Sequence, residues 1–242
     1  METMVILPTF DEAPNLRKLA LAILAIDDSY SLCVVDDASP DGTGDIADEL
    51  ARETRRVQVI HRKGKLGLGT AYAEGIALAM RCGAEHIVTM DCDFSHDPVH
   101  LPQLVAGMTE HDLMIGSRYI PGGGTRNWSL ARRILSRGAN FLARRMLGFS
   151  ARDVTSGYRC YSARVIRTID PKTIKSNGYS WLEEMLHRVH RQGFSVGETP
   201  IIFEDRRAGE SKISRSEIFK GMATLWRLFI ERFSRTNSRA SR

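Results

Sequence analysis

Short apolar runs alternate with longer amphipathic stretches in the N-terminal part of the chain. The apolar runs are bounded by turn residues and predict buried strands at residues 5–7, 32–35, 57–60 and 87–90. The amphipathic stretches repeat their apolar side chains at helical spacing and predict helices at residues 16–26, 43–53 and 70–81. Thr43 follows a turn and is expected to cap the second of these helices.

Strands that alternate with helices over short spans predict an α/β fold with a mostly parallel sheet and helices on both faces. In such sheets ligands bind outside the carboxyl ends of the strands. The acidic residues that follow the predicted strand ends are Glu12, Asp36, Asp37, Asp91 and Asp93. We therefore expect these carboxylates to meet at one rim of the sheet.

The C-terminal half differs in composition. Residues 121–124 form a Pro-Gly loop, and residues 127–147 are expected to be a basic helix in which arginines alternate with aromatic and aliphatic side chains. A β-rich portion is expected at residues 154–203, then an amphipathic helix at 216–233 and a polar, disordered tail at 236–242. We therefore expect one α/β domain over residues 1–215, which includes the basic segment 121–147, and a C-terminal helix with a basic tail over residues 216–242.

The composition suits a folded domain, since 43% of the 242 residues are hydrophobic. The formal net charge of +5 favours a phosphate-rich partner or an anionic surface, and nucleic acid, lipid headgroups and a phosphorylated small molecule all fit it. The four cysteines are scattered, which indicates reduced thiols inside the cell. We expect no signal peptide and no membrane-spanning run, so a protein of this kind that acts at membranes would lie on their surface.

The sequence Asp91-Cys92-Asp93 places two carboxylates directly after a predicted buried strand. Because side chains alternate along an extended backbone, both carboxylates are expected to point the same way. Such a pair can hold Mg²⁺ or Mn²⁺ when a diphosphate completes the coordination shell. For an isolated motif of this kind the commoner alternative is a turn with capping aspartates, and Asp97 before Pro98 fits that alternative.

A second pair of carboxylates, Asp36 and Asp37, follows another predicted strand. A carboxylate in this position can accept hydrogen bonds from a nucleobase or a ribose hydroxyl, whereas the alternative is a solvated acidic loop. Residues 64–69 are rich in glycine but match neither the dinucleotide-binding nor the P-loop pattern. We expect them to form a flexible connection that lets the backbone approach a ligand.

Several motifs follow one another in a defined order along the chain. They are Pro8-Thr9-Phe10-Asp11-Glu12, Val35-Asp36-Asp37 with Ser39-Pro40-Asp41-Gly42-Thr43, Gly64-Lys65-Leu66-Gly67-Leu68-Gly69, Asp91-Cys92-Asp93, Gly116-Ser117-Arg118-Tyr119, Ser156-Gly157-Tyr158-Arg159, and Arg206 with Gly209-Glu210-Ser211-Lys212. This ordered set resembles that of the dolichol-phosphate (polyprenol-phosphate) mannose synthases, which are inverting glycosyltransferases of the GT-A fold. The resemblance extends from about residue 5 to residue 212 and implies that fold for residues 1–215.

The resemblance also implies roles for individual residues. The nucleoside would be bound by Pro8, Phe10, Glu12, Val35 and Asp37. The nucleotide sugar would be bound by Asp91 and Cys92, and Mg²⁺ or Mn²⁺ by Asp93 and Ser95. The acceptor phosphate would be faced by Arg118, Arg132 and Ser136, and the donor diphosphate by Arg206 and Lys212. The residues expected to act in catalysis are Asp91, Asp93, Arg118, Arg206 and Lys212.

Two positions depart from the family pattern. Phe10 stands where the family often has Tyr, and Ser95 stands where some members have Gln as a metal ligand. Neither change removes a charge, so activity is still expected. For Arg132, a solvated helix face stays open as an alternative to phosphate binding.

The implied reaction is transfer of mannose from GDP-mannose to a polyprenyl or dolichyl phosphate with inversion. A synthase that uses UDP-glucose or another UDP-sugar remains an alternative, because no motif distinguishes the base or the sugar. Two other classes remain as competitors. A nucleic-acid-binding protein is supported by charge alone, and a catalytically inactive scaffold is disfavoured by the intact acidic and basic residues.

An acceptor lipid of this kind stays in the bilayer, so we expect a cytoplasmic protein that is peripheral on the membrane. The C-terminal helix predicts an interfacial surface through Ile218, Met222, Leu225, Trp226, Phe229 and Phe233. The alternatives are that this apolar stripe packs on the protein itself, or that a separate membrane-spanning partner exists. Residues 206–214 are rich in Gly and Ser and are expected to form a mobile lid over the nucleotide.

Overall fold

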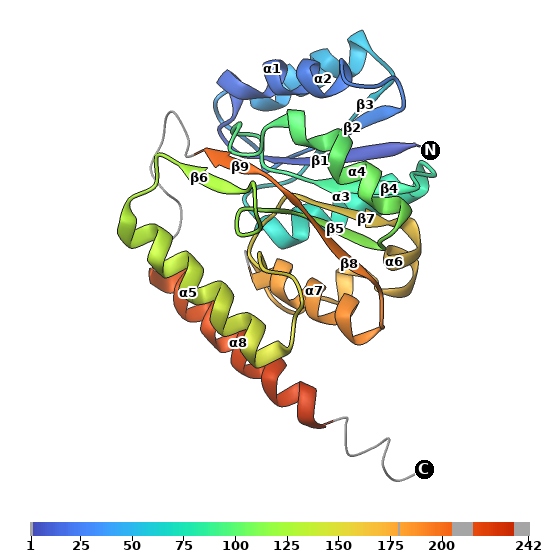
Figure 1. Ribbon diagram of the computed structural model, residues 1–242. Helices are drawn as coiled ribbons and strands as arrows, with labels where there is room; N and C mark the ends of the chain where they lie inside the picture. Colours follow the sequence, from blue (N-terminus) through green and yellow to red (C-terminus); the bar gives the residue numbers. More distant parts are fainter. Residues whose placement is uncertain (1, 179, 205–214, 235–242) are drawn as a thin grey trace.

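The computed structural model describes residues 2–178, 180–204 and 215–234 (Figure 1). The strands of its main sheet are β1 (Thr3–Thr9), β2 (Tyr30–Asp36), β3 (Val57–His61), β4 (His86–Thr89), β5 (Leu113–Ser117), β7 (Arg159–Ser162) and β8 (Val196–Pro200). Their order is β3-β2-β1-β4-β7-β5-β8. β7 runs antiparallel to both of its neighbours, whereas the other pairs are parallel. A second, parallel pair consists of β6 (Gly124–Arg126) and β9 (Ile202–Glu204).

Helices cover both faces of the main sheet (Figure 1). They are α1 (Ala13–Leu24), α2 (Thr43–Glu53), α3 (Leu68–Arg81), α4 (Leu101–Ala106), α5 (Leu130–Leu147), α6 (Ala163–Thr168), α7 (Ser180–Arg191) and α8 (Arg215–Ser234). Single turns of 3₁₀ helix lie at Pro98–His100, Gly107–Thr109 and Pro171–Thr173.

Alternate side chains of β1 enter two separate hydrophobic cores. Val5 and Leu7 pack in a core with apolar residues of α1, α2 and α4, whereas Ile6 packs with residues of α3 and α7 on the opposite face. α3 lies close against the sheet at Gly75, where an added Cβ atom would lie 2.3 Å from Cγ2 of Ile6. This alternation explains why the apolar runs of the sequence are nearly continuous, since both faces of each central strand are covered.

The structure confirms the predicted strands and helices up to residue 90, with ends that differ by a few residues. The predicted cap at Thr43 is wrong, because Gly42 is the cap residue and Thr43 is already helical. The Thr43 hydroxyl instead donates to Asp41 and accepts from the backbone N–H of Glu12. The turn before α2 is therefore tied to the end of β1.

One prediction for the C-terminal half is confirmed and one is wrong. The predicted basic helix is present, although it begins at Leu130 rather than at residue 127 because the hydroxyl of Ser129 caps it by accepting from the N–H of Arg132. Residues 154–203 are not mainly β, because they include α6 and the longer helix α7. The buried residues of α7, among them Leu182, Met185, Leu186 and Val189, recur at helical spacing.

α8 packs beside α5 and against α7 through one face only (Figure 1). Leu225 and Leu228 are buried on that face. Between them, Arg227 places a guanidinium nitrogen 2.5 Å from a carboxylate oxygen of Glu184 on α7. Glu184 also accepts from Arg188 and from the hydroxyl of Ser176, so its buried charge is fully surrounded by donors. Whether residues 216–242 form a unit separate from residues 1–215 stays a prediction.

We expect the docking of α8 to depend on pH through Glu184. Burial alone would raise the pKa of Glu184, but the donors from Ser176, Arg227 and Arg188 lower it from an ordinary value of 4.5 to about 2. A carboxyl whose pKa is lowered on folding stabilises the protein above its unfolded pKa, and this contribution is lost as the pH falls through the folded value. Glu184→Gln should therefore lower the free energy of unfolding at neutral pH by roughly 2–3 kcal/mol.

Urea unfolding measured across the acidic range tests this prediction. Glu231→Gln is the matched control, because Glu231 contacts the same arginine at 3.3 Å but its side chain is 44% exposed. The control should change stability by less than about 0.5 kcal/mol. Parallel stability profiles for wild type and Glu184→Gln between neutral and strongly acidic pH would contradict the prediction.

Candidate active site

The carboxyl ends of β2, β1 and β4 lie side by side, because β1 pairs in parallel with both neighbours. A non-glycine residue with positive φ follows each of these strands: Asp11 at 59°, Ala38 at 55° and Phe94 at 59°. Backbone strain of this kind concentrates at ligand-binding turns. The same turns carry Glu12, Asp37 and the pair Asp91 and Asp93. The predicted meeting of these acidic residues at one rim is therefore confirmed.

Asp36 has an internal role at this rim. Its carboxylate accepts from the hydroxyls of Thr9 and Ser39 and from the backbone N–H of Ser39. These bonds join the end of β1 to the turn after β2. Asp36 therefore holds the loop that presents Asp37.

In the turn after β4 Cys92 is buried, and the common direction expected for the Asp91 and Asp93 side chains stays a prediction. The Cys92 thiol packs in the core with α1 and α4, and burial raises its pKa well above the ordinary value. Any contact of Cys92 with a ligand would therefore use its backbone. One Asp93 oxygen accepts from the backbone N–H of Ser95 at 3.0 Å and from its hydroxyl at 2.5 Å. Asp97 accepts from the N–H of Val99, so the predicted capping role of Asp97 is confirmed.

His96 supports the turn after β4, and the sequence analysis did not identify this residue. Its Nδ1 accepts the backbone N–H of Asp91 at 3.0 Å, and its ring packs against Tyr158 and Phe203. Burial lowers the pKa of His96, which favours the neutral ring that this hydrogen bond requires. A single histidine in a turn offers no sequence motif, so only the tertiary contacts indicate its role.

Arg62, which the sequence analysis also missed, fixes Asp37 on the expected nucleoside side. Its guanidinium lies 2.5 Å from the Asp37 carboxylate and also donates to Thr70 and to the carbonyl of Gly67. Burial raises the pKa of Asp37, and the charge of Arg62 opposes this change. Arg62 thus connects the turn after β2 to the glycine-rich loop before α3.

The remaining residues expected at the nucleoside differ in what they can offer. The Lys65 ammonium lies 4.2 Å from the centroid of the Phe10 ring, so a positive charge already occupies one face of this ring. Pro8 is half-buried, and Val35 is fully buried in the core under α3. Val35 can therefore contribute only its backbone. The carboxylate of Glu12 accepts from the side chain of Asn15.

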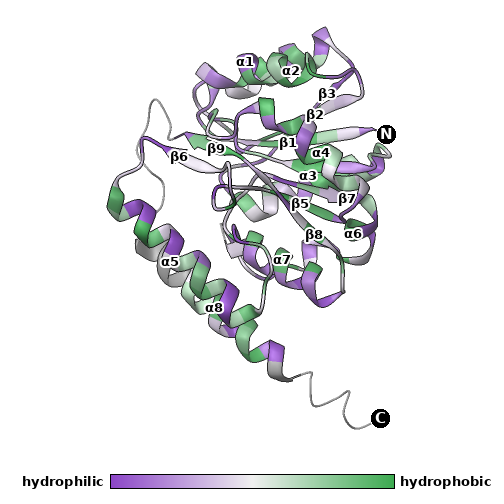
Figure 2. Cartoon of the chain, in the orientation of Figure 1, coloured by the Kyte–Doolittle hydropathy of each residue, from purple (hydrophilic) through white to green (hydrophobic). Residues whose placement is uncertain are grey.

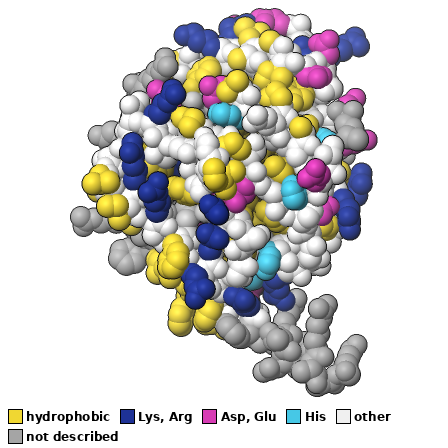
Figure 3. All heavy atoms as spheres, in the orientation of Figure 1, with side chains coloured by type: hydrophobic (Ala, Val, Ile, Leu, Met, Phe, Trp, Pro, Cys, Tyr) yellow, Lys and Arg dark blue, Asp and Glu magenta, His cyan; other side chains and the backbone are white. Residues whose placement is uncertain are grey.

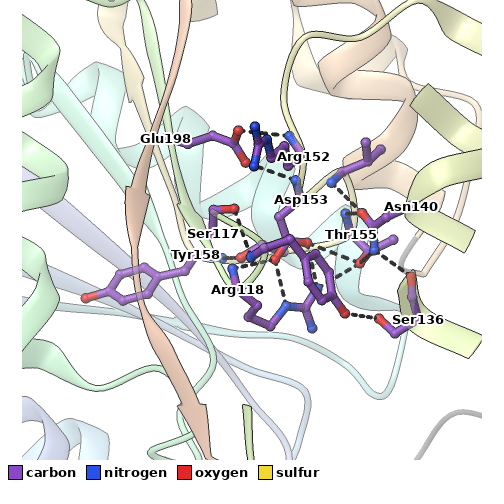
Figure 4. A network of polar contacts seen from close by, with 12 residues as sticks. Ser117, Arg118, Ser136, Asn140, Arg152, Asp153, Thr155, Tyr158 and Glu198 are labelled. Carbon is purple, nitrogen blue, oxygen red and sulfur yellow. Dashed lines mark hydrogen bonds and ion pairs between the residues drawn. The ribbon is translucent and has the colours of Figure 1, made fainter. Parts of the chain in front are cut away.

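On the expected acceptor side, Arg118 is held by a buried ion pair with Asp153 (Figure 4). Two guanidinium nitrogens donate to the two Asp153 oxygens, each at 2.7 Å, and a further bond reaches Thr155 at 2.8 Å. Burial alone would lower the pKa of Arg118 and raise that of Asp153, but their mutual attraction reverses both shifts. Both residues therefore stay charged inside the protein. Asn140 of α5 joins the network through Thr155 and the N–H of Val154.

Aromatic side chains bring the other predicted acceptor residues towards Arg118. The Trp128 ring lies 5.4 Å from the guanidinium carbon of Arg118 and 4.2 Å from that of Arg132. The Tyr119 hydroxyl donates to Ser136 at 2.6 Å (Figure 4). Arg118, Arg132 and Ser136 are therefore gathered around Trp128 and Tyr119. Arg206, Lys212 and the expected lid at residues 206–214 lie outside the described residues.

The side chains at the end of β4 fit a hard divalent cation in their chemistry. Asp91, Asp93 and Ser95 supply oxygen atoms only, which suits Mg²⁺ and Mn²⁺. Across residues 2–178, 180–204 and 215–234, no group of three His, Cys, Asp or Glu side chains could hold a metal ion by itself. Ser95 and ligand phosphates would therefore be needed to complete the coordination shell.

Comparison with known proteins places this geometry in a family. The profile described as "Glycosyl transferase family 2" matches residues 4–170. The chain belongs to glycosyl transferase family 2. It is 43% identical over 222 residues to the polyprenol monophosphomannose synthase of Mycolicibacterium smegmatis, a match that covers 91% of this chain and 84% of the relative. It is 44% identical over 216 residues to the undecaprenyl-phosphate mannosyltransferase of Micrococcus luteus, with 88% of each chain covered.

Solved structures support the fold of this family 2 glycosyltransferase. Glucosyl-3-phosphoglycerate synthase from Mycobacterium tuberculosis, in complex with Mn²⁺, UDP and glucosyl-3-phosphoglycerate, matches with a TM-score of 0.69 at 19% identity, over 94% of this chain and 79% of that one. A mannosyltransferase from Pyrobaculum calidifontis in complex with GDP-Man and Mn²⁺ has a TM-score of 0.58 at 15% identity, over 87% and 58%. The expected GT-A fold and the resemblance to polyprenyl-phosphate mannose synthases are both confirmed.

We expect Asp153→Ala to destabilise the protein by about 3–5 kcal/mol, because it leaves the buried Arg118 charge without its partner. Thr155→Val is the matched control, since it removes one neutral acceptor of the same guanidinium and should cost about 1 kcal/mol. Urea unfolding at neutral pH measures both. Equal losses in the two variants would show that the ion pair does not hold this part of the structure.

Proposed function

We propose that this protein transfers mannose from GDP-mannose to a polyprenyl phosphate, with inversion at the anomeric carbon, and releases GDP. The observation that carries the proposal is the 43–44% identity over about nine-tenths of the chain to relatives named polyprenol monophosphomannose synthase and undecaprenyl-phosphate mannosyltransferase. The gathered carboxylates at one side of the site and arginines at the other are consistent with a donor and an acceptor that both carry phosphate.

Donor binding is assigned to the rim formed by β2, β1 and β4. Glu12 and Asp37 are proposed to accept hydrogen bonds from the nucleoside, and the contact of Arg62 with Asp37 supports this role. Asp91 and Asp93 lie at the neighbouring strand end, where the sugar diphosphate would be. Asp93 and Ser95 would hold Mg²⁺ or Mn²⁺, which when bound would supply positive charge next to the leaving diphosphate. We propose the same charge-offsetting role for Arg206 and Lys212.

The acceptor phosphate has to be aligned with the anomeric carbon, and it does not have to be activated by a base. A phosphate monoester has a second pKa of about 6, so its oxygen is already largely anionic at neutral pH and no general base is required. Arg118 is held by Asp153 and Thr155, so its proposed role is to fix the shape of the acceptor side. Arg132 and Ser136 are proposed to orient the phosphate oxygen towards the anomeric carbon. An attack from the face opposite the leaving group inverts an α-linked donor into a β-linked product.

α5 and α8 are proposed to bring this site to the cytoplasmic surface of the membrane. In the described part of the chain, no helix is long and apolar enough to cross a bilayer. Apolar side chains are exposed instead, on α5 at Leu130, Ile134 and Phe141 and on α8 at Met222, Trp226 and Ile230. Figure 2 shows hydrophobic and hydrophilic residues interspersed along these helices, and Figure 3 shows apolar and basic side chains together on the same side of the molecule. An interfacial helix has this composition.

The apolar stripe predicted for the C-terminal helix is therefore divided. Leu225 is buried and Phe229 packs against the core, whereas Met222 and Trp226 face outwards. One face of α8 therefore packs on the protein, and the exposed face is proposed to contact the membrane. The side chains of Ile218 and Phe233 lie outside the described residues.

The proposed reaction is tested by incubating the purified protein with polyprenyl phosphate, Mg²⁺ or Mn²⁺ and a panel of labelled GDP- and UDP-sugars. Radiolabelled mannose in the lipid phase with GDP-mannose alone supports the proposal. Transfer from UDP-glucose instead would establish the alternative donor, and transfer from no sugar would refute the enzyme assignment. Retention of the anomeric configuration in the product would refute the inversion.

Asp93→Ala should reduce transfer by at least about a hundredfold, because it removes a carboxylate proposed to bind the cation next to the leaving diphosphate. Turnover in excess metal measures the loss. Asp97→Ala is the matched control, since this nearby aspartate caps a short helix and should leave turnover within about twofold of wild type. Wild-type turnover of Asp93→Ala, or full activity in excess chelator, would refute the metal assignment.

Trp226→Ser should weaken binding to anionic vesicles by about tenfold without loss of folding, because the side chain is 60% exposed on the proposed membrane face. Flotation with liposomes at low and high salt measures the binding, and salt should weaken it in wild type. Leu21→Ser, a change of an exposed apolar residue on α1, is the control and should have no effect. If the wild-type protein does not bind anionic vesicles, a separate membrane-spanning partner becomes the better explanation of how the protein reaches its lipid acceptor.

A further inference from the structure

A hollow of about 430 Å³ lies between α5 and the segments that follow β5 and α5. The cations at its wall are Arg118, Arg137, Arg144 and Arg152, and no acidic residue lines it among the described residues. We call this hollow the arginine pocket. Tyr119 and Phe141 also line it, whereas Arg132 and Ser136 do not. The pocket therefore adjoins the proposed acceptor site, with which it shares Arg118, and its other side chains differ from those assigned to the acceptor phosphate.

The positive charge of the arginine pocket is largely uncompensated. Arg118 is neutralised by Asp153. For Arg137, Arg144 and Arg152, no carboxylate within the described ranges forms an ion pair with the guanidinium group, and the buried Nε of Arg144 has no hydrogen-bond partner. The nearby Glu198 uses its two oxygens to accept the backbone N–H groups of Arg152 and Asp153 (Figure 4). Three guanidinium groups beside one hollow create a positive potential that favours the binding of an anion.

The residue type indicates which anion fits. Guanidinium groups bind phosphate through paired N–H donors, and a terminal phosphate has three oxygens that can satisfy several arginines at once. Arg137 and Arg144 are seven residues apart on α5, about 10 Å along the helix axis, so their long side chains can approach an anion from both ends. Arg152 comes from the loop after α5 and adds a third direction.

The surroundings indicate what the phosphate is attached to. Phe141 is 65% exposed at the edge of the pocket, and Ile134, on the same helix, is 63% exposed. These apolar side chains belong to the face that is proposed to lie on the membrane. A ligand with a phosphate headgroup and an apolar tail would match both the pocket and this face.

We propose that the arginine pocket binds the phosphomonoester headgroup of a membrane lipid of the phosphatidic acid type, at a position distinct from the acceptor phosphate. The inference rests on the membrane contact in the proposed function. Tyr119, which donates to Ser136, and Arg118, which pairs with Asp153, line the pocket and connect it to the proposed acceptor site. A lipid held by Arg137, Arg144 and Arg152 fixes the depth and rotation of α5 at the bilayer surface.

The test compares two double variants of α5 that change the charge equally. Arg137→Gln with Arg144→Gln alters the pocket, and Arg133→Gln with Arg145→Gln alters exposed arginines of the same helix that do not line it. Flotation uses phosphatidylcholine vesicles that contain phosphatidic acid or phosphatidylglycerol, adjusted to equal zeta potential. Circular dichroism and thermal unfolding establish that both variants fold.

Wild type is expected to bind phosphatidic acid vesicles about tenfold more tightly than phosphatidylglycerol vesicles, the effect of about one additional charge-assisted hydrogen bond. The pocket variant should lose this preference. The control variant should keep the ratio even where its binding to both vesicles weakens, because non-specific attraction depends on charge alone. No preference in wild type, or the same loss of preference in both variants, would overturn the proposal.

Glycerol 3-phosphate distinguishes a lipid from a soluble phosphate. If glycerol 3-phosphate raises the thermal midpoint of wild type but not of the pocket variant, while wild type shows no preference for phosphatidic acid vesicles, the site binds soluble phosphate, and the lipid assignment is overturned. Transfer to a short, detergent-dispersed acceptor is measured separately. The pocket variant should keep wild-type turnover in that assay, so failure of the headgroup preference and failure of the proposed transfer reaction are distinguished.

Discussion

Arg118 and Asp153 are both buried and both charged, and neither charge is tolerable in the interior without the other. Their pairing joins the end of β5 to the loop that follows α5, and Asn140 extends the connection into α5 itself. The Trp128 ring packs on the guanidinium of Arg118 and also on that of Arg132. Tyr119, next to Arg118 in the chain, donates to Ser136. The arrangement of the proposed acceptor side, and the position of the arginine pocket next to it, both depend on this ion pair.

The proposed donor side depends on strand order rather than on a single contact. With β1 between β2 and β4, the turns after all three parallel strands end at one edge of the sheet. Asp36 ties the ends of β1 and β2 together, while Arg62 and His96 brace Asp37 and the backbone of Asp91 from outside the motifs. The carboxylates that would meet a nucleotide sugar are therefore held by residues with no direct part in the proposed reaction.

α5 and α8 connect this chemistry to a surface. The inner face of α8 is fixed by Leu225, Leu228 and the Arg227–Glu184 pair, which leaves Met222 and Trp226 outside. Because α5 carries Ser136 and Asn140 towards the site and Ile134 and Phe141 towards solvent, its orientation at a bilayer would set the position of the acceptor phosphate. Headgroup binding in the arginine pocket and membrane contact by α8 would act on the same pair of helices.

The sequence by itself determined the four parallel strands β1–β4, their helices, the rim of Glu12, Asp37, Asp91 and Asp93, and, through ordered motifs, the family. These features follow from local periodicity and from the rule that parallel strands end at one edge. Only the tertiary structure decided that β7 inserts antiparallel between β4 and β5 and that Cys92 turns into the core. It also decided that Arg62, His96 and Asp153 support the site. The Arg62–Asp37 and Arg118–Asp153 contacts join residues that are 25 and 35 positions apart in the sequence. Whether two such charges pair depends on burial and packing, which a local sequence pattern does not contain.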